Sequence, residues 1–538
     1  MIHIVDMQFK KIRGWARGIA LLLALILLLC LGACSPADPD GANKPDLLLP
    51  NLVETQGADS TALTPVHTVN PPDHSPALLP EALSEAPDLT HAPHYTLNLI
   101  IADDLQSFDG SSHLLYTNNE DTALDHLYFR LLPNAGGAYG DGSLTVSQVL
   151  VDGEIVEYEL SSDDSVMKVP FGTPLEPGDR VEIAVDFSGQ VPENFGFDQN
   201  SAGYGIYNYS DGVLSLASWY PILAVYDEDG WNLDPVSSIG DSVYSDIANY
   251  TVEVTVPRDV ILAATGVEVD RQEDDGGTRF SYVSGPVRDF YLIMSEDFTL
   301  QSMAVDGTKV TSYTLPGNKA AGKLALSIAS ESLGIFNEQF GPYPYTELDV
   351  VDAPMRYASG VEFPGIILIR DSLYEDTDNP IFTVVLAHEV AHQWWYNVVG
   401  NDVFDDPWLD EALTSYSSSL YYEFSQGKSA PQGLIDYWYD HYQGTVDRGY
   451  NERVTDSLAY FEGLPDPKVY GGIVYSKGAL FFKALRDEIG DEAFFQALRN
   501  YYNLYGFTIA EPGDLLNAFE VASGRSLDEL YQEWLYSP

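Results

Sequence analysis

The sequence predicts a multi-domain α and β protein, in which an antiparallel β domain over residues 94–304 precedes a mainly helical domain over residues 305–538. Two changes in hydrophobic period support this division. From Tyr95 onward, apolar residues alternate with polar or small ones, which is typical of strands that bury one face. Near Ala320 the apolar residues begin to recur at intervals of three and four, which indicates helices.

The N-terminus has the features of an export signal. Basic residues up to Arg17 precede the apolar run 18–33, and the segment LGACS (31–35) is similar to a bacterial lipobox. We therefore predict a lipoprotein signal peptide over residues 1–33, followed by cleavage and lipidation at Cys34. The mature protein would then be extracytoplasmic and anchored to a bacterial cell membrane. An uncleaved signal anchor is the alternative, and it also tethers an exported protein.

Residues 34–93 are rich in Pro, Ala, Asp and Ser and show no sustained hydrophobic period. A segment of this composition buries too little apolar surface to offset the conformational entropy that folding removes. The sequence therefore predicts a disordered, acidic linker between the lipid anchor and the folded domains.

The chain is strongly acidic, with 81 Asp and Glu against 26 Lys and Arg and a net charge of −55. Such a surface repels phosphate backbones, which argues against nucleic acid as a partner. The acidic segments 227–230 and 405–406 are weak calcium candidates, because solvated acidic loops are the commoner explanation. Removal of the signal would leave Cys34 as the only cysteine, so we expect no disulfide.

Local patterns predict individual elements of the β domain. Alternation recurs over residues 181–187 and 252–256, which predicts two further strands. The pair Asp152-Gly153 stands between two apolar runs and predicts a tight hairpin.

The second domain begins with a helical stripe over residues 324–336, followed by a strand at 349–352. The chain is predicted to be helical from about residue 425 onward. Its last helix would begin with a capping box that starts at Ser526.

Residues 384–416 carry the motif that predicts the chemistry. His388 and His392 are four residues apart, so on a helix their imidazoles lie one turn apart and can bind one metal ion. Zinc in catalytic sites accepts two imidazoles and a carboxylate and keeps a fourth position for water. Glu389, beside the first histidine, is then the candidate general base. A structural pair of core histidines is the alternative.

The third ligand is inferred by elimination. Only His441 follows the histidine pair, and Cys34 is the only cysteine of the predicted mature chain, so a nearby acid is favoured. Asp410 and Glu411 open a second helical pattern that can face the first helix. We predict Glu411, in preference to Asp410, as the third ligand of one Zn²⁺ per chain.

This arrangement resembles the aminopeptidase N-like gluzincins, in which HExxH is followed after eighteen residues by Glu. The flanking segments of that family usually read AHQWWGN and WLNEGF, whereas here they read AHQWWYN and WLDEA. Tyr396, Asp410 and Ala412 are therefore departures, and none is at a ligand position. The resemblance covers about residues 94–538 and implies an N-terminal β-saddle and a thermolysin-like catalytic domain. Larger relatives continue into a helical-repeat domain, and without it we expect a more open site.

The resemblance implies three further site residues. Gly360 and Glu362 stand where the family has Gly-Ala-Met-Glu-Asn, and this glutamate would bind the free α-ammonium of the substrate. A surface glutamate in a turn is the alternative, because Phe363 replaces the family's Asn. Tyr475, ahead of Ser-Lys-Gly-Ala, would stabilise the oxyanion, with Tyr470 as the competing candidate.

The predicted function is a zinc metallopeptidase that removes N-terminal residues from peptides, with Glu389 as general base and Tyr475 as oxyanion stabiliser. A zinc endopeptidase of the same fold is the alternative if Phe363 and an open cleft prevent amine recognition. A non-catalytic, tethered peptide-binding lipoprotein is a second alternative. The presence of Glu389 argues against it, because a binding module needs no base beside its metal.

Overall fold

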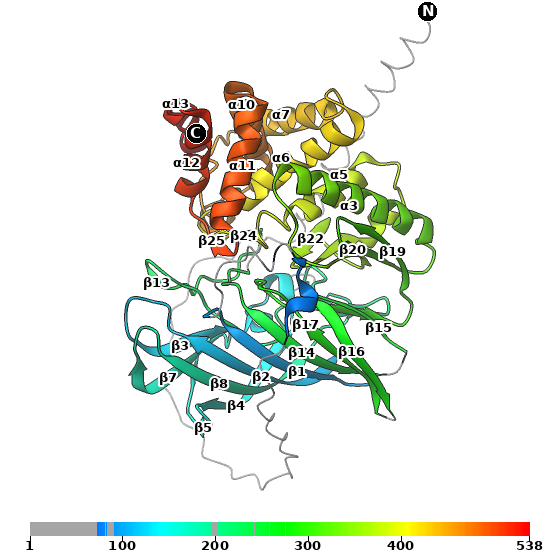
Figure 1. Ribbon diagram of the computed structural model, residues 1–538, viewed down its shortest axis with the longest axis vertical. Helices are drawn as coiled ribbons and strands as arrows, with labels where there is room; N and C mark the ends of the chain where they lie inside the picture. Colours follow the sequence, from blue (N-terminus) through cyan, green and yellow to red (C-terminus); the bar gives the residue numbers. More distant parts are fainter. Residues whose placement is uncertain are drawn as a thin grey trace, which may run out of the picture.

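The computed structural model describes residues 73–80, 82, 91–195, 203–240, 243–257, 259–274 and 276–538. This part of the chain forms a β-rich domain and a second domain in which helices cover a smaller sheet (Figure 1). The predicted order of a β domain followed by a mainly helical domain is confirmed. The predicted signal peptide, Cys34 and most of the predicted linker lie outside the described residues.

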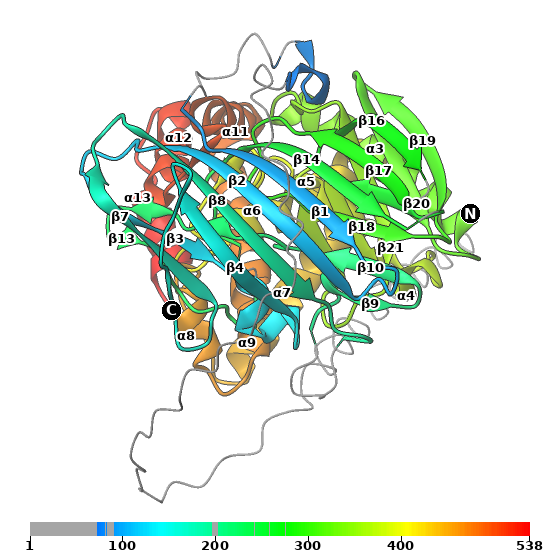
Figure 2. The same ribbon diagram turned by 90° about the horizontal axis from the view of Figure 1, so that it is seen from below.

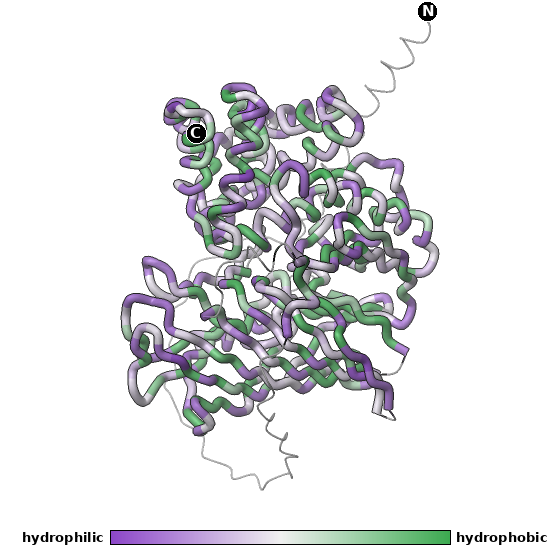
Figure 3. Tube along the Cα trace, viewed as in Figure 1, coloured by the Kyte–Doolittle hydropathy of each residue, from purple (hydrophilic) through white to green (hydrophobic). Residues whose placement is uncertain are grey.

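The first domain is built on an eight-stranded sheet in the order β16-β17-β14-β1-β2-β8-β4-β5, which extends across the molecule in Figure 2. Its strands are β1 (His94–Ile101), β2 (Ser107–Thr117), β4 (Ser143–Val151), β5 (Glu154–Ile155), β8 (Arg180–Gln190), β14 (Asn249–Val256), β16 (Val267–Asp274) and β17 (Gly277–Val283). In β1, Tyr95, Leu97 and Leu99 are buried between less buried neighbours, as the period of two predicts. The C-terminal part of β16, residues 270–274, is exposed and hydrophilic (Figure 3).

Two four-stranded sheets and a short hairpin complete this domain. One sheet has the order β15 (Ile261–Ala264), β18 (Leu292–Ser295), β10 (Val213–Leu216) and β9 (Tyr207–Ser210). The other has the order β11 (Ile222–Leu223), β3 (Leu124–Arg130), β7 (Val166–Leu175) and β6 (Glu159–Leu160), and β12 (Tyr226–Asp227) pairs with β13 (Gly230–Trp231).

The predicted hairpin at Asp152-Gly153 is confirmed. It joins β4 to β5, and both residues have positive φ angles, of 50° and 82°. Positive φ at both central positions is typical of the two-residue turn that suits the twist of a hairpin. One pairing differs from the predicted antiparallel sheet, because β1 and β14 are parallel. Strands that are distant in sequence can pair in either direction, and no local pattern distinguishes the two.

The second domain contains a five-stranded sheet in the order β19 (Thr299–Val305), β20 (Thr308–Thr314), β21 (Glu347–Ala353), β23 (Ile366–Arg370) and β22 (Gly360–Phe363). The strand predicted at 349–352 is confirmed as part of β21. The predicted boundary at 304/305 falls inside β19, which belongs to this second sheet, so the boundary lies before Thr299. The strand β22 forms one edge of the sheet and is antiparallel to β23.

Helices make up most of the remaining chain. They are α3 (Lys319–Gln339), α4 (Asp371–Tyr374), α5 (Pro380–Ala391), α6 (Trp408–Gln426), α7 (Gln432–Asp447), α8 (Leu458–Glu462), α9 (Lys468–Tyr470), α10 (Gly478–Ile489), α11 (Asp491–Tyr505), α12 (Pro512–Ser523) and α13 (Asp528–Tyr531). The segments Gly471–Lys477 and Gln532–Tyr536 are π-helical, and β24 (Val399–Gly400) pairs with β25 (Thr508–Ile509). Within the described ranges, no helix is both long and apolar enough to cross a membrane.

Two local predictions are wrong. No capping box starts at Ser526, because α13 begins at Asp528 after an N-cap Leu527 whose amide is bound by Glu520 instead. The linker is not disordered throughout, because Ser75–Ala77 form a turn and Leu78 pairs with Tyr345 of the second domain. Apolar side chains in this part of the linker reach the core, although the surrounding composition shows no period.

Arg288 is a buried residue that links the two domains through hydrogen bonds. Its guanidinium is buried and donates hydrogen bonds to the carbonyl oxygens of Ser245 (3.0 Å), Tyr396 (2.6 Å) and Thr508 (2.5 Å). A Cβ on Gly400 would lie 2.1 Å from its Cζ, so this position requires glycine. The β domain is thereby fixed to the loop that follows α5.

Candidate functional site

The site lies where the last turn of α5 meets the first turn of α6. Asn379 caps the start of α5 by accepting the amide of Ile381, and Pro380 occupies the first position, where its missing N–H costs nothing. His388 lies in the last turn of α5 and His392 is its C-cap. These two signals fix the start of the helix, so the histidines occupy its other end.

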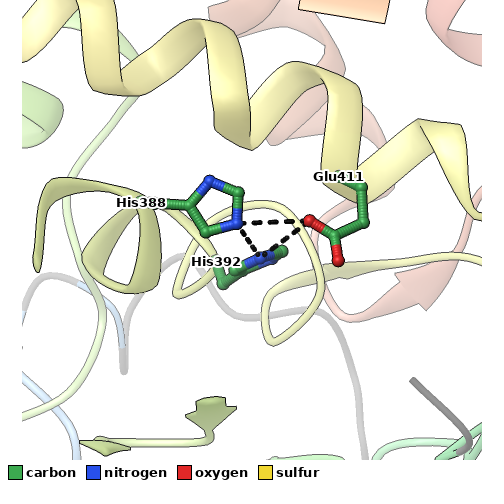
Figure 4. A group of neighbouring side chains, drawn as sticks. All are labelled: His388, His392 and Glu411. Carbon is green, nitrogen blue, oxygen red and sulfur yellow. Dashed lines mark hydrogen bonds and ion pairs between the residues drawn. The ribbon is translucent and has the colours of Figure 1, made fainter. Parts of the chain in front are cut away.

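Two histidines and one glutamate converge in this place (Figure 4). The Nε2 atoms of His388 and His392 are 3.2 Å apart, and Glu411 Oε2 lies 3.2 Å from the first and 3.6 Å from the second. Asp410 does not join the group, because its carboxylate accepts the backbone amide of Glu411 (2.8 Å). The structure therefore brings together the three predicted zinc ligands.

The donor set and its spacing fit zinc. Ligand bonds of 2.0–2.1 Å at tetrahedral angles place donor atoms about 3.3 Å apart, close to the observed separations. Among the described residues, only two groups of His, Cys, Asp and Glu are close enough for a metal, and both include His392. The acidic segments 227–230 and 405–406 form no such group, so the structure lends no support to calcium there.

His392 is oriented by its own helix end. Its Nδ1 donates to the carbonyl oxygen of Trp395 at 3.0 Å, and Thr414 Oγ1 lies 3.4 Å from the same nitrogen. A donor hydrogen bond at Nδ1 leaves the lone pair on Nε2, which is the atom that faces His388 and Glu411. The tautomer that can bind a metal is therefore selected by the backbone of the loop after α5.

Burial and the neighbouring histidines affect the Glu411 carboxyl in opposite directions. Burial raises its pKa, but the neighbouring imidazoles of His388 and His392 outweigh this effect and hold the pKa well below its usual range. The carboxyl is therefore ionised, as a metal ligand must be.

Glu389 and Glu362 meet beside His388, His392 and Glu411, the candidate metal-ligand group. Glu362 lies on β22, and its Oε1 is 3.8 Å from His392 Nε2. Burial raises the pKa of Glu389 well above its usual value, and the nearby charge of Glu362 raises it further. The pKa of Glu362 is also raised, mainly by burial. Glu389 Oε2 is buried and has no hydrogen-bond partner within the described part of the chain.

The close approach of β22 to Glu389 requires a glycine at position 360. A Cβ at Gly360 would lie 2.3 Å from Glu389 Oε1, so any larger residue would displace this carboxylate. Side chains alternate along a strand, so Gly360 and Glu362 share the face toward α5. The structure thus places both predicted residues beside Glu389.

Phe363, the departure from the family motif, faces away from this site. Its ring is buried and stacks on Tyr291 of the β domain, with centroids 3.9 Å apart and planes at 5°. Its backbone is held by Gln393, which donates to Phe363 O (3.0 Å) and accepts from Gly365 N (2.9 Å). The substitution therefore fills the domain interface and leaves the face that carries Glu362 unchanged.

Tyr475, and not Tyr470, reaches the metal-ligand group. It lies in the π-helical segment Gly471–Lys477, and its hydroxyl donates to Glu411 Oε1. Its ring lies against that of His388, with centroids 6.0 Å apart. Tyr470 instead packs on Phe461, so the competing candidate is not beside the ligands.

Several residues that hold the backbone around this site could not be identified from the sequence. Gln393 holds β22, the Trp395 carbonyl orients His392, and Arg288 binds the next carbonyl along the chain. One signal was visible, because Tyr396 stands where the family motif has glycine. Its φ angle is 127°, a conformation that L residues rarely adopt.

Comparisons with known proteins agree with this geometry. Residues 324–534 match the model of the peptidase family M1 domain. Aminopeptidase M1-B of Oryza sativa subsp. japonica is 26% identical over 428 residues, which is 75% of this chain and 45% of that protein. Probable aminopeptidase 1 of Saccharolobus solfataricus is 27% identical over 307 residues, 54% of this chain and 38% of that protein. The chain thus spans less than half the length of these curated relatives.

Solved structures show the same fold. The M1 zinc metallopeptidase from Deinococcus radiodurans superposes with a TM-score of 0.64 and 22% identity, covering 83% of this chain and 94% of that one. A mutant of that enzyme bound to a Tyr-Ser-Ala substrate gives a TM-score of 0.62 and 21% identity, with coverage of 82% and 94%. The matched domain, the shared two-domain fold and the clustered histidines and glutamate all make this chain similar to peptidase family M1.

Proposed function

We propose that this protein is a zinc aminopeptidase that binds one Zn²⁺ per chain through His388, His392 and Glu411. The observation that carries the proposal is the position of Glu362, a buried carboxylate on an edge strand, 3.8 Å from a metal-ligand nitrogen. An edge strand can hydrogen-bond an extended peptide, and a carboxylate beside it can bind the peptide's α-ammonium. That contact would limit the length of chain on the N-terminal side of the scissile bond.

The catalytic roles follow from the positions of the side chains. Bound zinc supplies polarisation of the scissile carbonyl and a lowered pKa for a water molecule. Glu389 would accept a proton from the attacking water and return it to the leaving amine, a transfer that its raised pKa favours. The Tyr475 hydroxyl, which donates to Glu411 Oε1, would donate instead to the substrate oxygen that becomes negatively charged, and a neutral donor avoids a second cation beside the metal.

We further propose that the protein is held at a bacterial cell membrane, outside the cytoplasm, by a lipid on Cys34. The support is the lipobox-like segment LGACS after an apolar run, which lies outside the described residues. The substrates would then be extracytoplasmic peptides with a free N-terminus.

Zinc content tests the ligands. Purified protein should contain about one zinc per chain, because two imidazoles and a carboxylate at this spacing suit tetrahedral zinc. The double variant His388→Ala, His392→Ala should lose most of it by elemental analysis, whereas the control His113→Ala, exposed on β2, should not. Undiminished zinc in the double variant would refute the ligand assignment.

Glu389→Gln tests the general base. The amide keeps the size of the side chain but cannot take a proton, so zinc should remain while kcat falls by at least about 10²-fold. Glu331→Gln, at the Tyr421 contact on α3, is the matched control and should keep normal turnover. Wild-type rates in Glu389→Gln would require a different base.

Glu362→Ala separates an aminopeptidase from an endopeptidase. Loss of a charge-assisted contact of roughly 1.5–3 kcal/mol should lower kcat/KM about 10- to 150-fold, only for peptides with a free amine. We would measure kcat/KM for free and acetylated forms of one peptide in both proteins, with zinc content as the control. A wild type that cleaves both forms equally fast would establish the endopeptidase. Zinc-loaded protein that cleaves neither form would favour the binding module.

Cys34→Ser tests the anchor. Without the thiol no lipid can be attached, so the variant should leave the membrane fraction or accumulate unprocessed. Fractionation of cells with immunodetection measures both outcomes. Correctly cleaved Cys34→Ser protein that stays on the membrane would disprove the lipid anchor.

A further inference from the structure

Tyr475 lies in an unusual piece of backbone. The segment Gly471–Lys477 is π-helical and continues directly into α10. Wide π turns inside helical segments are rare and are frequently found at functional sites. The direction of the phenol therefore depends on what holds this turn against its neighbours.

The helix α7 holds one side of the turn. His441 Nδ1 is 2.9 Å from the hydroxyl oxygen of Ser476, the residue next to Tyr475. One turn further along α7, Thr445 packs against Gly472, where a Cβ would lie 2.0 Å from Thr445 Oγ1. Glycine at this position lets α7 and the π turn approach closely enough for the His441–Ser476 contact.

On its other side, the π turn packs against helix α6 and against the rings of His388 and Tyr470. A Cβ on Gly478 would lie 2.5 Å from the Cβ of Ala412, the residue after Glu411. The Tyr475 ring lies between those of His388 and Tyr470, with centroids 6.0 Å and 5.5 Å away. The π turn is thus fixed between α7 and the helices that carry the metal ligands.

The His441–Ser476 contact is suited to a fixed hydrogen bond. Ser476 is buried, with 1% of its surface exposed, so water does not compete for its hydroxyl. Burial, and to a smaller extent the charge of Arg448, lowers the pKa of His441 to about 4. The ring is therefore neutral near neutral pH and has a nitrogen that can accept from Ser476. Tyr437 OH is further from the same nitrogen, at 3.4 Å.

We propose that His441 is a positioning residue, which acts through its hydrogen bond to Ser476 to aim the Tyr475 hydroxyl at the reacting carbonyl oxygen. This inference rests on the proposed role of Tyr475 in the peptidase reaction. His441 itself does not touch the metal-ligand group. Its effect should consequently appear in the chemical step and only while Tyr475 carries its hydroxyl.

A double-mutant cycle tests this dependence. Ser476→Ala removes one hydroxyl from a buried position with little change in shape, and it should lower kcat roughly 5- to 20-fold with KM and zinc content unchanged. A misplacement of a reacting group by about 1 Å can lower the rate about 10²-fold, and we expect a smaller loss here because the hydroxyl would shift less. Tyr475→Phe alone should lower kcat by about 10²-fold or more. In the Tyr475→Phe background, Ser476→Ala should change kcat less than about twofold, because no hydroxyl remains to be aimed.

Further variants separate the hydrogen bond from packing. His441→Asn places an amide where Nδ1 was and should keep most of kcat, whereas His441→Leu should lose as much as Ser476→Ala. Tyr437→Phe keeps the ring that stacks on His441, with centroids 5.5 Å apart, and should leave kcat unchanged. An equal loss in Tyr437→Phe and Ser476→Ala would refute the assignment to the Ser476 bond.

The outcomes distinguish this inference from the proposed function. Wild-type kcat in Tyr475→Phe would refute the role of Tyr475 itself. A large loss in Tyr475→Phe, with Ser476→Ala equally harmful in both backgrounds, would keep that role and overturn the positioning by His441. An unchanged kcat in Ser476→Ala would overturn it as well.

Discussion

The site depends on the close approach of two helix ends. The last turn of α5 supplies His388 and His392, and the first turn of α6 supplies Glu411, with donor atoms 3.2–3.6 Å apart. At this distance the three side chains form a stable group only if a cation or hydrogen bonds replace the water that burial removes. The packing around α5 and α6 therefore sets the chemistry of the site.

Several ionisable groups are buried together here, which costs on the order of several kcal/mol per ion. The surrounding structure offsets this cost with specific partners. The Trp395 carbonyl binds His392, the Tyr475 hydroxyl binds Glu411, and the Glu411 amide binds Asp410. Glu389 is the exception. Burial and the nearby charge of Glu362 raise its pKa, and one of its carboxylate oxygens has no hydrogen-bond partner among the described residues. A carboxylate with these features is suited to moving a proton rather than to holding the fold together.

The sequence predicted the parts of the site that depend on local spacing. The four-residue separation of His388 and His392 becomes one helical turn, and the strand period places Gly360 and Glu362 on one face. Longer-range relations were not predictable. Arg288 binds carbonyls of Ser245, Tyr396 and Thr508, which no window of sequence contains.

The same distinction holds for the fold. The hairpin at Asp152-Gly153 and the helix α3 follow from local residue types, and both were predicted. The parallel pairing of β1 with β14 and the domain boundary before Thr299 depend on which distant strands meet. Phe363 illustrates the limit most clearly, because its identity suggested an altered cleft, whereas its ring stacks on Tyr291 in the domain interface.

Tyr396 shows how the fold accommodates a departure from the family motif. A non-glycine residue at a φ of 127° costs about 1–3 kcal/mol and persists only when its surroundings fix it. Here the Tyr396 carbonyl accepts from Arg288 (2.6 Å), its amide donates to Val399 O (2.8 Å), and its side chain is buried. The preceding carbonyl, that of Trp395, orients His392. The contacts that hold this strained residue therefore also orient His392, so the β domain that supplies Arg288 is part of the site's support.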